Sequence, residues 1–152
     1  MKPLFVLLIA FVLSALLIKW STKQVDYQLA ARIAMACMLV FTAVGHFVFT
    51  KGMTAMIPNF LPFKSQIAFL TGIFEIVFAL GLLLPNYRYM TGWLIIAFFV
   101  LILPANIKAA IEYIDYQTGD LNGPGLSYLW LRIPMQFFFI IWVYMSTLKP
   151  SL

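Results

Sequence analysis

The chain has 152 residues, of which 64% are hydrophobic and only 10% are charged. Because a soluble domain carries about 25% charged residues, this composition excludes a water-soluble fold. The formal net charge of +5 arises from Lys and Arg residues that stand singly beside hydrophobic runs. Such placement is typical of residues that set membrane topology and contact headgroups, so we expect no nucleic-acid partner.

Five apolar runs account for most of the chain, at residues 3–18, 33–49, 66–84, 90–107 and 126–146. Each approaches the roughly 20 residues with which a helix crosses about 30 Å of hydrocarbon. The runs lack the alternation of barrel strands, and an open sheet edge is not tolerated in lipid. The sequence therefore predicts an all-α membrane protein, a single domain over residues 1–152 that forms a bundle of about five transmembrane helices in a lipid bilayer.

The first run and the longer connections have distinct characters. Residues 3–18 resemble a signal peptide, but no small-x-small cleavage site follows, so we interpret them as a retained helix. Residues 51–65 contain two prolines, which forbid one continuous helix, and their apolar side chains favour a broken amphipathic segment in the membrane interface. Residues 112–128 are the one clearly polar stretch, with glycines and a proline that predict turns.

Membrane orientation follows from the basic residues. Five crossings place the two termini on opposite sides of the membrane, and the basic residues divide almost evenly between the sides. The first loop, with Lys19, Lys23 and Arg32, is the densest basic cluster, so we expect a cytoplasmic C-terminus in a bacterial inner (plasma) membrane. Cys37, the single cysteine, excludes an intrachain disulfide, and we expect it to be a buried small hydrophobic residue.

Glu75 stands at the midpoint of the third run, where a charged side chain costs about 2.5 to 3.5 kcal/mol and calls for compensation. Ala68, Gly72 and Ala79 lie near the same helix face, and small residues allow a neighbouring helix to come close. We therefore expect Glu75 to point into the bundle.

Further polar residues fall at similar depth on other runs. Arg132 and Gln136 are one turn apart on the fifth run, and an ion pair between Glu75 and Arg132 is predicted if those helices pack together. His46 and Asn106 lie toward the same side of the membrane. We expect these side chains to converge in a cavity that binds a ligand, and the candidate ligand-binding residues are His46, Glu75, Asn106, Arg132 and Gln136.

Each of these residues also has a structural interpretation, which the sequence leaves open. Glu75 and Arg132 fix helix register in that interpretation, and His46 is a hydrogen-bonding core residue. Asn106 satisfies backbone groups freed by Pro104, and Gln136 links two helices. We predict no metal site, because one His, one Cys and one intramembrane Glu do not form a metal cage.

Residues 32–144 resemble the DoxX-like membrane proteins, which are small bundles of four helices. The stretches that carry the resemblance are RIAMACMLVFTAVGHF, MIPNFLP, LTGIFEIVFALGLLLP, LPANIKAA and LRIPMQ. The resemblance implies a four-helix core over residues 29–146, to which residues 3–18 add an N-terminal helix. Some relatives are associated with membrane oxidoreductases, including a subunit of thiosulfate:quinone oxidoreductase, so the resemblance implies a quinone as a candidate ligand.

The leading functional hypothesis is a binding or accessory subunit whose intramembrane polar pocket holds a small amphipathic ligand, a quinone or a lipid. Its partners would be other membrane subunits, an oxidoreductase among them, or further copies of the chain. Three alternatives remain open: a quinone-linked oxidoreductase component in which Glu75 or His46 moves protons, a purely structural subunit of a larger membrane complex, and a small transporter. The sequence contains neither a nucleophile beside a base nor a phosphate-binding loop, so it indicates no enzyme mechanism. We expect no cofactor other than a quinone.

Overall fold

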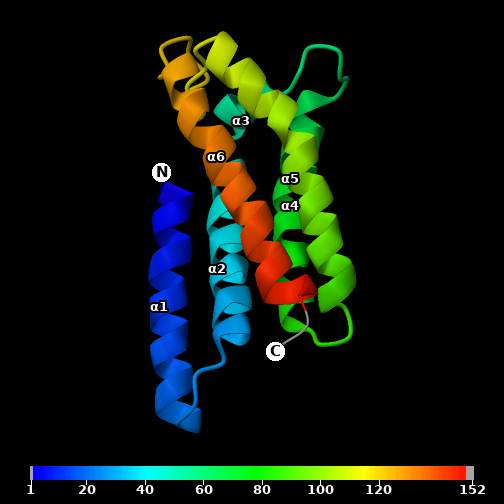
Figure 1. The fold of residues 1–152 in the computed structure, drawn as a ribbon. Coiled ribbons are helices and arrows are strands. Elements are labelled where there is room, and N and C mark those ends of the chain that lie inside the picture. Colours follow the sequence, from blue (N-terminus) through cyan, green and yellow to red (C-terminus); the bar gives the residue numbers. More distant parts are fainter. Residues whose placement is uncertain (1, 150–152) are drawn as a thin grey trace.

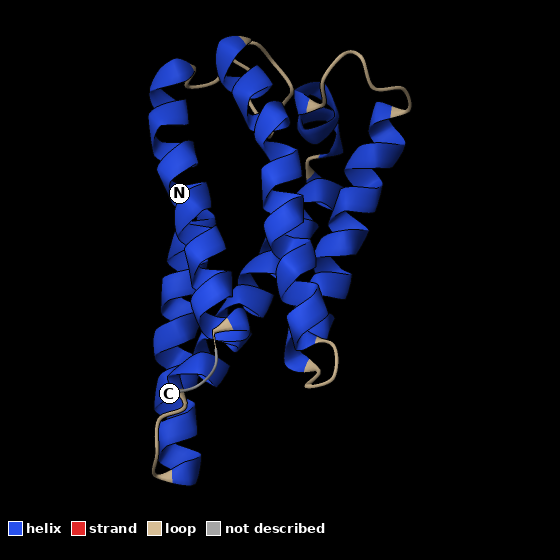
Figure 2. Ribbon diagram, turned by 45° about the vertical axis from the view of Figure 1, so that its right-hand side comes forward, coloured by secondary structure: helices blue, strands red, loops and turns tan. Residues whose placement is uncertain are grey.

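The computed structural model describes residues 2–149, and within this range the chain is all-helical, without a strand (Figure 2). The elements are α1 (Lys2–Thr22), α2 (Tyr27–Val48), α3 (Thr50–Met56), α4 (Lys64–Leu83), α5 (Arg88–Ile111) and α6 (Leu126–Val143), with a π-helical turn η1 (Tyr144–Leu148) continuing α6. Among residues 2–149, five helices are long and apolar enough to cross a membrane: α1, α2, α4, α5, and α6 with η1. The prediction of five long apolar helices is confirmed.

The five long helices run up and down beside one another (Figure 1). α2 has its most extensive contacts with α4 and α1, and α5 lies against α6 and α4. The α1–α2 and α4–α5 connections are at the lower end of the view, while α3 and the α5–α6 loop are at the upper end. The loops therefore alternate between the two ends, as five membrane crossings require.

The core lies where α2, α4, α5 and α6 meet. Its fully buried side chains include Met35, Leu39, Leu82, Ile95 and Val143. The outer faces carry exposed large apolar residues along every long helix, the inverse of a water-soluble surface. This pattern favours lipid as the surrounding medium.

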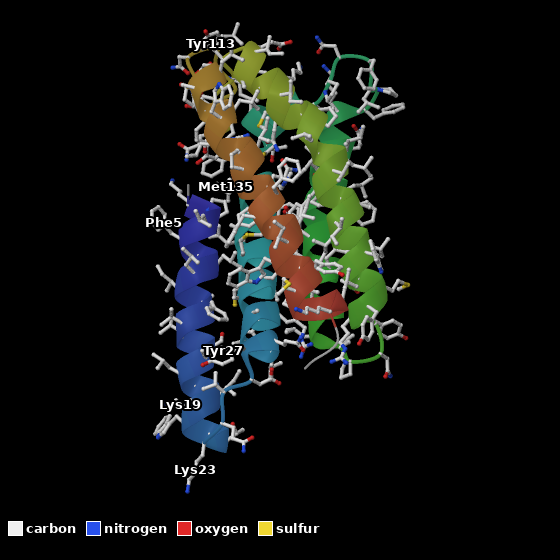
Figure 3. The ribbon with its side chains drawn as sticks, viewed as in Figure 1. Phe5, Lys19, Lys23, Tyr27, Tyr113 and Met135 are labelled. Carbon is white, nitrogen blue, oxygen red and sulfur yellow. The ribbon has the colours of Figure 1, made fainter. Side chains whose placement is uncertain are left out.

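α1 lies at the edge of the bundle, beside α2. Leu7 is fully buried in the core, and the Phe11 ring packs edge-on against Trp142 with centroids 5.2 Å apart. Phe5, in contrast, is 57% exposed and points away from the bundle (Figure 3). Lys19 and Lys23 lie at the end of α1 opposite to Tyr113, so the basic first loop and the polar α5–α6 loop are at opposite ends of the molecule.

Residues 51–65 form the expected broken segment. The short helix α3 ends at Met56, ahead of Pro58, and α4 begins at Lys64 after Phe63, whose φ of 54° is left-handed. Lys108 of α5 donates to the carbonyl oxygens of Ala55 (2.8 Å) and Ile57 (2.9 Å), which satisfies acceptors at the end of α3. The position of this segment in the membrane interface stays a prediction.

Cys37 corrects one expectation from the sequence. Its side chain is exposed on α2 rather than buried. The neighbouring positions Ala36 and Met38 face the core, and Cys37 falls on the opposite side of the helix. In an all-apolar run, hydrophobicity alone does not distinguish the face toward lipid from the face toward protein.

Candidate functional site

His46 of α2 and Glu75 of α4 form a polar pair between the two helices. His46 Nε2 and Glu75 Oε2 are 3.7 Å apart, and the side chains are 19% and 6% exposed, respectively. Thr42, one turn before His46, donates to the backbone carbonyls of Met38 and Leu39 of its own helix. Glu75 Oε2 itself is buried and has no hydrogen-bond partner among residues 2–149. The predicted inward orientation of Glu75 is confirmed.

The hydrogen bonds of His46 fix its neutral tautomer. Nδ1 lies 3.0 Å from the carbonyl oxygen of Ala68 and 3.1 Å from Thr71 Oγ1, whose hydroxyl donates to the same carbonyl. Because a carbonyl oxygen only accepts, we assign the ring hydrogen to Nδ1, which makes Nε2 an acceptor in the neutral ring. Nε2 then faces a carboxylate oxygen, also an acceptor, and the pair has room for one further hydrogen.

The close approach of α2 and α4 depends on Gly72. A Cβ at this position would lie 2.9 Å from the Cβ of His46 and 3.1 Å from Cζ of Phe47. Ala68, Gly72, Glu75 and Ala79 are all buried on this face of α4. The prediction that small residues beside Glu75 admit a neighbouring helix is confirmed, and that helix is α2.

Asn106, Arg132 and Gln136 form a second polar cluster, between α5 and α6. Arg132 Nη1 donates to Asn106 Oδ1 (2.7 Å), and the guanidinium lies 4.5 Å from the centroid of the Tyr128 ring. Asn106 Nδ2 donates to Gln136 Oε1 (3.4 Å), and Gln136 Nε2 donates to the carbonyl of Phe99. The polar side chains of this cluster therefore hydrogen-bond to one another, which agrees with a structural role.

Gln136 hydrogen-bonds to the backbone of α5 beside the turn that Pro104 disturbs. Pro104 lacks the N–H that would bond four residues back, and it disturbs the carbonyls of that turn. The Phe99 carbonyl, next to the one that loses its partner, receives the amide of Gln136 from α6. Asn106, which the sequence offered for the backbone near Pro104, bonds to the side chains of Arg132 and Gln136.

The predicted ion pair between Glu75 and Arg132 is wrong. No such pair occurs among the described residues, in which Glu75 pairs with His46 and Arg132 bonds to Asn106. The physical reason lies in helix order, because α4 packs against α2 and α5 and has hardly any contact with α6. The five predicted residues thus form two clusters rather than one.

A small cavity adjoins the second cluster, below the α5–α6 loop. Its volume is about 20 Å³, enough for one water molecule. Asn106 and Arg132 line it together with Tyr116 and Tyr128, while His46, Glu75 and Gln136 do not. This cavity is too small for a drug-sized ligand.

The sequence analysis missed one residue of the first cluster, Thr71, whose Oγ1 lies 3.1 Å from His46 Nδ1. Thr71 precedes Glu75 by four residues on α4. Polar residues at this spacing share a helix face, so the signal was present in the sequence. Within residues 2–149, no group of three His, Cys, Asp or Glu side chains is placed to hold a metal ion.

Comparison with known proteins identifies a family. The family model of a domain of unknown function, DUF8561, matches residues 35–147, which include all five predicted site residues. No curated protein and no solved structure matches the chain. The match begins within α2, so α1 lies outside it. The chain belongs to the DUF8561 family.

Proposed function

We propose that this protein is a membrane-embedded binding subunit in which the His46–Glu75 pair holds the polar end of a small amphipathic ligand. One observation carries the proposal: Glu75 Oε2 is buried, has no hydrogen-bond partner among the described residues, and faces the imidazole of His46 at 3.7 Å. A buried acceptor without a partner costs about 1 to 3 kcal/mol, and more when charged. A ligand that supplies a hydrogen-bond donor removes this cost.

The chemistry of the pair selects the ligand class. With Nδ1–H directed to Ala68, the neutral imidazole presents Nε2 as an acceptor, and the ionised form of Glu75 presents Oε2 as a second acceptor beside it. A hydroxyl group donates to such a pair, whereas a ring carbonyl cannot. The ligand is therefore an amphipathic hydroxyl compound, and a quinol fits this description better than the corresponding quinone. The His46 side chain is 19% exposed and that of Glu75 only 6%, so the ligand approaches the pair from the side of His46.

The proposals for location, family relationship and partners rest mainly on the sequence. The protein resides in a bacterial inner membrane with the C-terminus in the cytoplasm, and α2, α4, α5 and α6 form the core that α1 extends. The proposed DoxX-like relationship rests on the sequence segments that carry the resemblance. A further membrane subunit or a second copy of the chain is the partner.

The test compares the binding of decylubiquinol and decylubiquinone to the purified protein in detergent, measured by thermal shift and by isothermal titration. A hydrogen bond to a charged group contributes about 1.5 to 3 kcal/mol, so the Kd for the quinol should be lower by at least about tenfold. Glu75→Gln replaces one acceptor by a donor and should abolish this preference. Asp120→Asn removes a 60% exposed carboxylate outside the His46–Glu75 pair and should preserve the preference for the quinol.

Three results would overturn the proposal. Equal binding of the two compounds by the wild type would show that the pair does not distinguish a donor from an acceptor. An unchanged preference in Glu75→Gln would show that the quinol binds elsewhere. If neither compound binds, the pair is a structural element of the bundle and the protein is a scaffold subunit.

A further inference from the structure

An apolar groove lies between the loop before α4 and the last turns of α5, apart from both polar clusters. Its volume is about 410 Å³, within the range of small-molecule sites. Pro58 and Phe60 form one wall, and Pro104, Ile107 and Ile111 form the other. The three residues of α5 are spaced by three and four positions, so they share one helix face.

Charged groups gather at the edge of this groove, around Asn59. The Oδ1 atom of Asn59 accepts from Lys64 Nζ (2.6 Å) and from Lys108 Nζ (3.2 Å), which brings two positive charges to within about 6 Å of each other. Glu112, which also lines the groove, is 3.7 Å from Lys108. Two cations and one anion leave the edge with a net charge of +1.

The two lysines have different capacities. Lys108 donates to Ala55, Ile57 and Asn59, so its three hydrogens are used and it contributes charge alone. Lys64 makes one hydrogen bond among the described residues, to Asn59, and keeps two hydrogens for a ligand. Glu112 has a side chain that is 43% exposed and is available as an acceptor.

From this arrangement we propose that the groove binds one phospholipid whose headgroup carries a single negative charge and hydroxyl groups, as in phosphatidylglycerol. The phosphodiester neutralises the net charge of +1 and receives hydrogen bonds from Lys64. The headgroup hydroxyls donate to Glu112, and an acyl chain lies against Pro104, Ile107 and Ile111. Phe60, 80% exposed at the mouth, fits the depth at which aromatic rings meet headgroups.

The experiment is native mass spectrometry of the purified full chain with equimolar palmitoyl-oleoyl phosphatidylglycerol, phosphatidylethanolamine and phosphatidylcholine. The wild type should retain one phosphatidylglycerol in preference to the other lipids. Lys64→Gln should lower this retention about fivefold, the equivalent of about 1 kcal/mol for one lysine near an anionic headgroup. Lys51→Gln is the matched control, because this 80% exposed lysine pairs with Asp120 outside the groove, and it should retain the lipid as the wild type does.

Two further measurements test the groove itself. Ile111→Trp enlarges a 59% exposed side chain in the wall, which fills the groove while folding is kept, and it should abolish retention. Glycerophosphoglycerol, the headgroup without acyl chains, should not displace the lipid at millimolar concentration. Equal retention of the three lipids, equal loss in Lys51→Gln and Lys64→Gln, unchanged retention in Ile111→Trp, or displacement by the headgroup alone would each overturn the proposal.

Discussion

A methyl group added at Gly72 tests the packing that creates the His46–Glu75 pair. In Gly72→Ala the new Cβ would lie 2.9 Å from the Cβ of His46, an atom fixed to the backbone of α2, so a helix must shift. Overpacking of this kind costs about 1 to 3 kcal/mol. Replacing a helical Gly by Ala contributes about 0.5 to 1 kcal/mol of stability, so we expect a net loss of about 1 kcal/mol and at most about 2.5 kcal/mol.

Gly45→Ala is the matched control, because Gly45 also lies on α2 close to His46. Its added Cβ would be 3.7 Å from the terminal methyl of Met53, which is an ordinary contact. This variant should be as stable as the wild type or slightly more so. Unfolding by SDS in detergent micelles, followed by circular dichroism, measures both variants. If Gly72→Ala and Gly45→Ala have the same stability, the close approach of α2 and α4 is not as described.

Three further predictions concern the second cluster and the topology. Gln136→Leu should destabilise the bundle by about 1 to 3 kcal/mol in SDS unfolding, because it removes the hydrogen bonds to Asn106 and to the Phe99 carbonyl, yet it should leave decylubiquinol binding unchanged. In a double-mutant cycle, the changes in unfolding free energy caused by Glu75→Gln and Arg132→Gln should be additive within about 0.5 kcal/mol, because α4 and α6 have hardly any contact. A coupling energy above about 1 kcal/mol would show that the two side chains form an ion pair after all. For topology, single cysteines are introduced in residues 57–63 and in residues 112–125 of a chain without the native cysteine. Both sets should react with an impermeant thiol reagent from the same side of the membrane, and labelling from opposite sides would contradict the fold.

The helices were predictable because each contains a long apolar run bounded by polar or aromatic residues. The inward orientation of Glu75 was also predictable, since a carboxylate at this depth needs a protein environment and the small residues beside it indicate a close neighbour. The broken segment before α4 followed from Pro58 and Pro62, which cannot continue a helix.

The partner of Glu75 was not predictable by the same reasoning. The position of Arg132 along its helix gives its depth in the membrane, but it does not determine which helices are neighbours. In this fold α2 packs against α4 beside Glu75, and α6, which carries Arg132, does not. The exposure of Cys37 was missed for a related reason, because an apolar run has no polar face that marks the outside. The basic residues as a group were expected to set topology, but Lys108 also binds the carbonyls at the end of α3, through contacts that no local sequence pattern indicates.

Infrared difference spectroscopy of the carboxyl group tests the central claim most directly, since it observes Glu75 at the moment of binding. Decylubiquinol added to the wild-type protein should change the absorption of one carboxyl group, and the change should be absent from Glu75→Gln and present in Asp120→Asn. A difference spectrum that is the same in the wild type and in Glu75→Gln would contradict the assignment of Glu75 as the ligand-binding group.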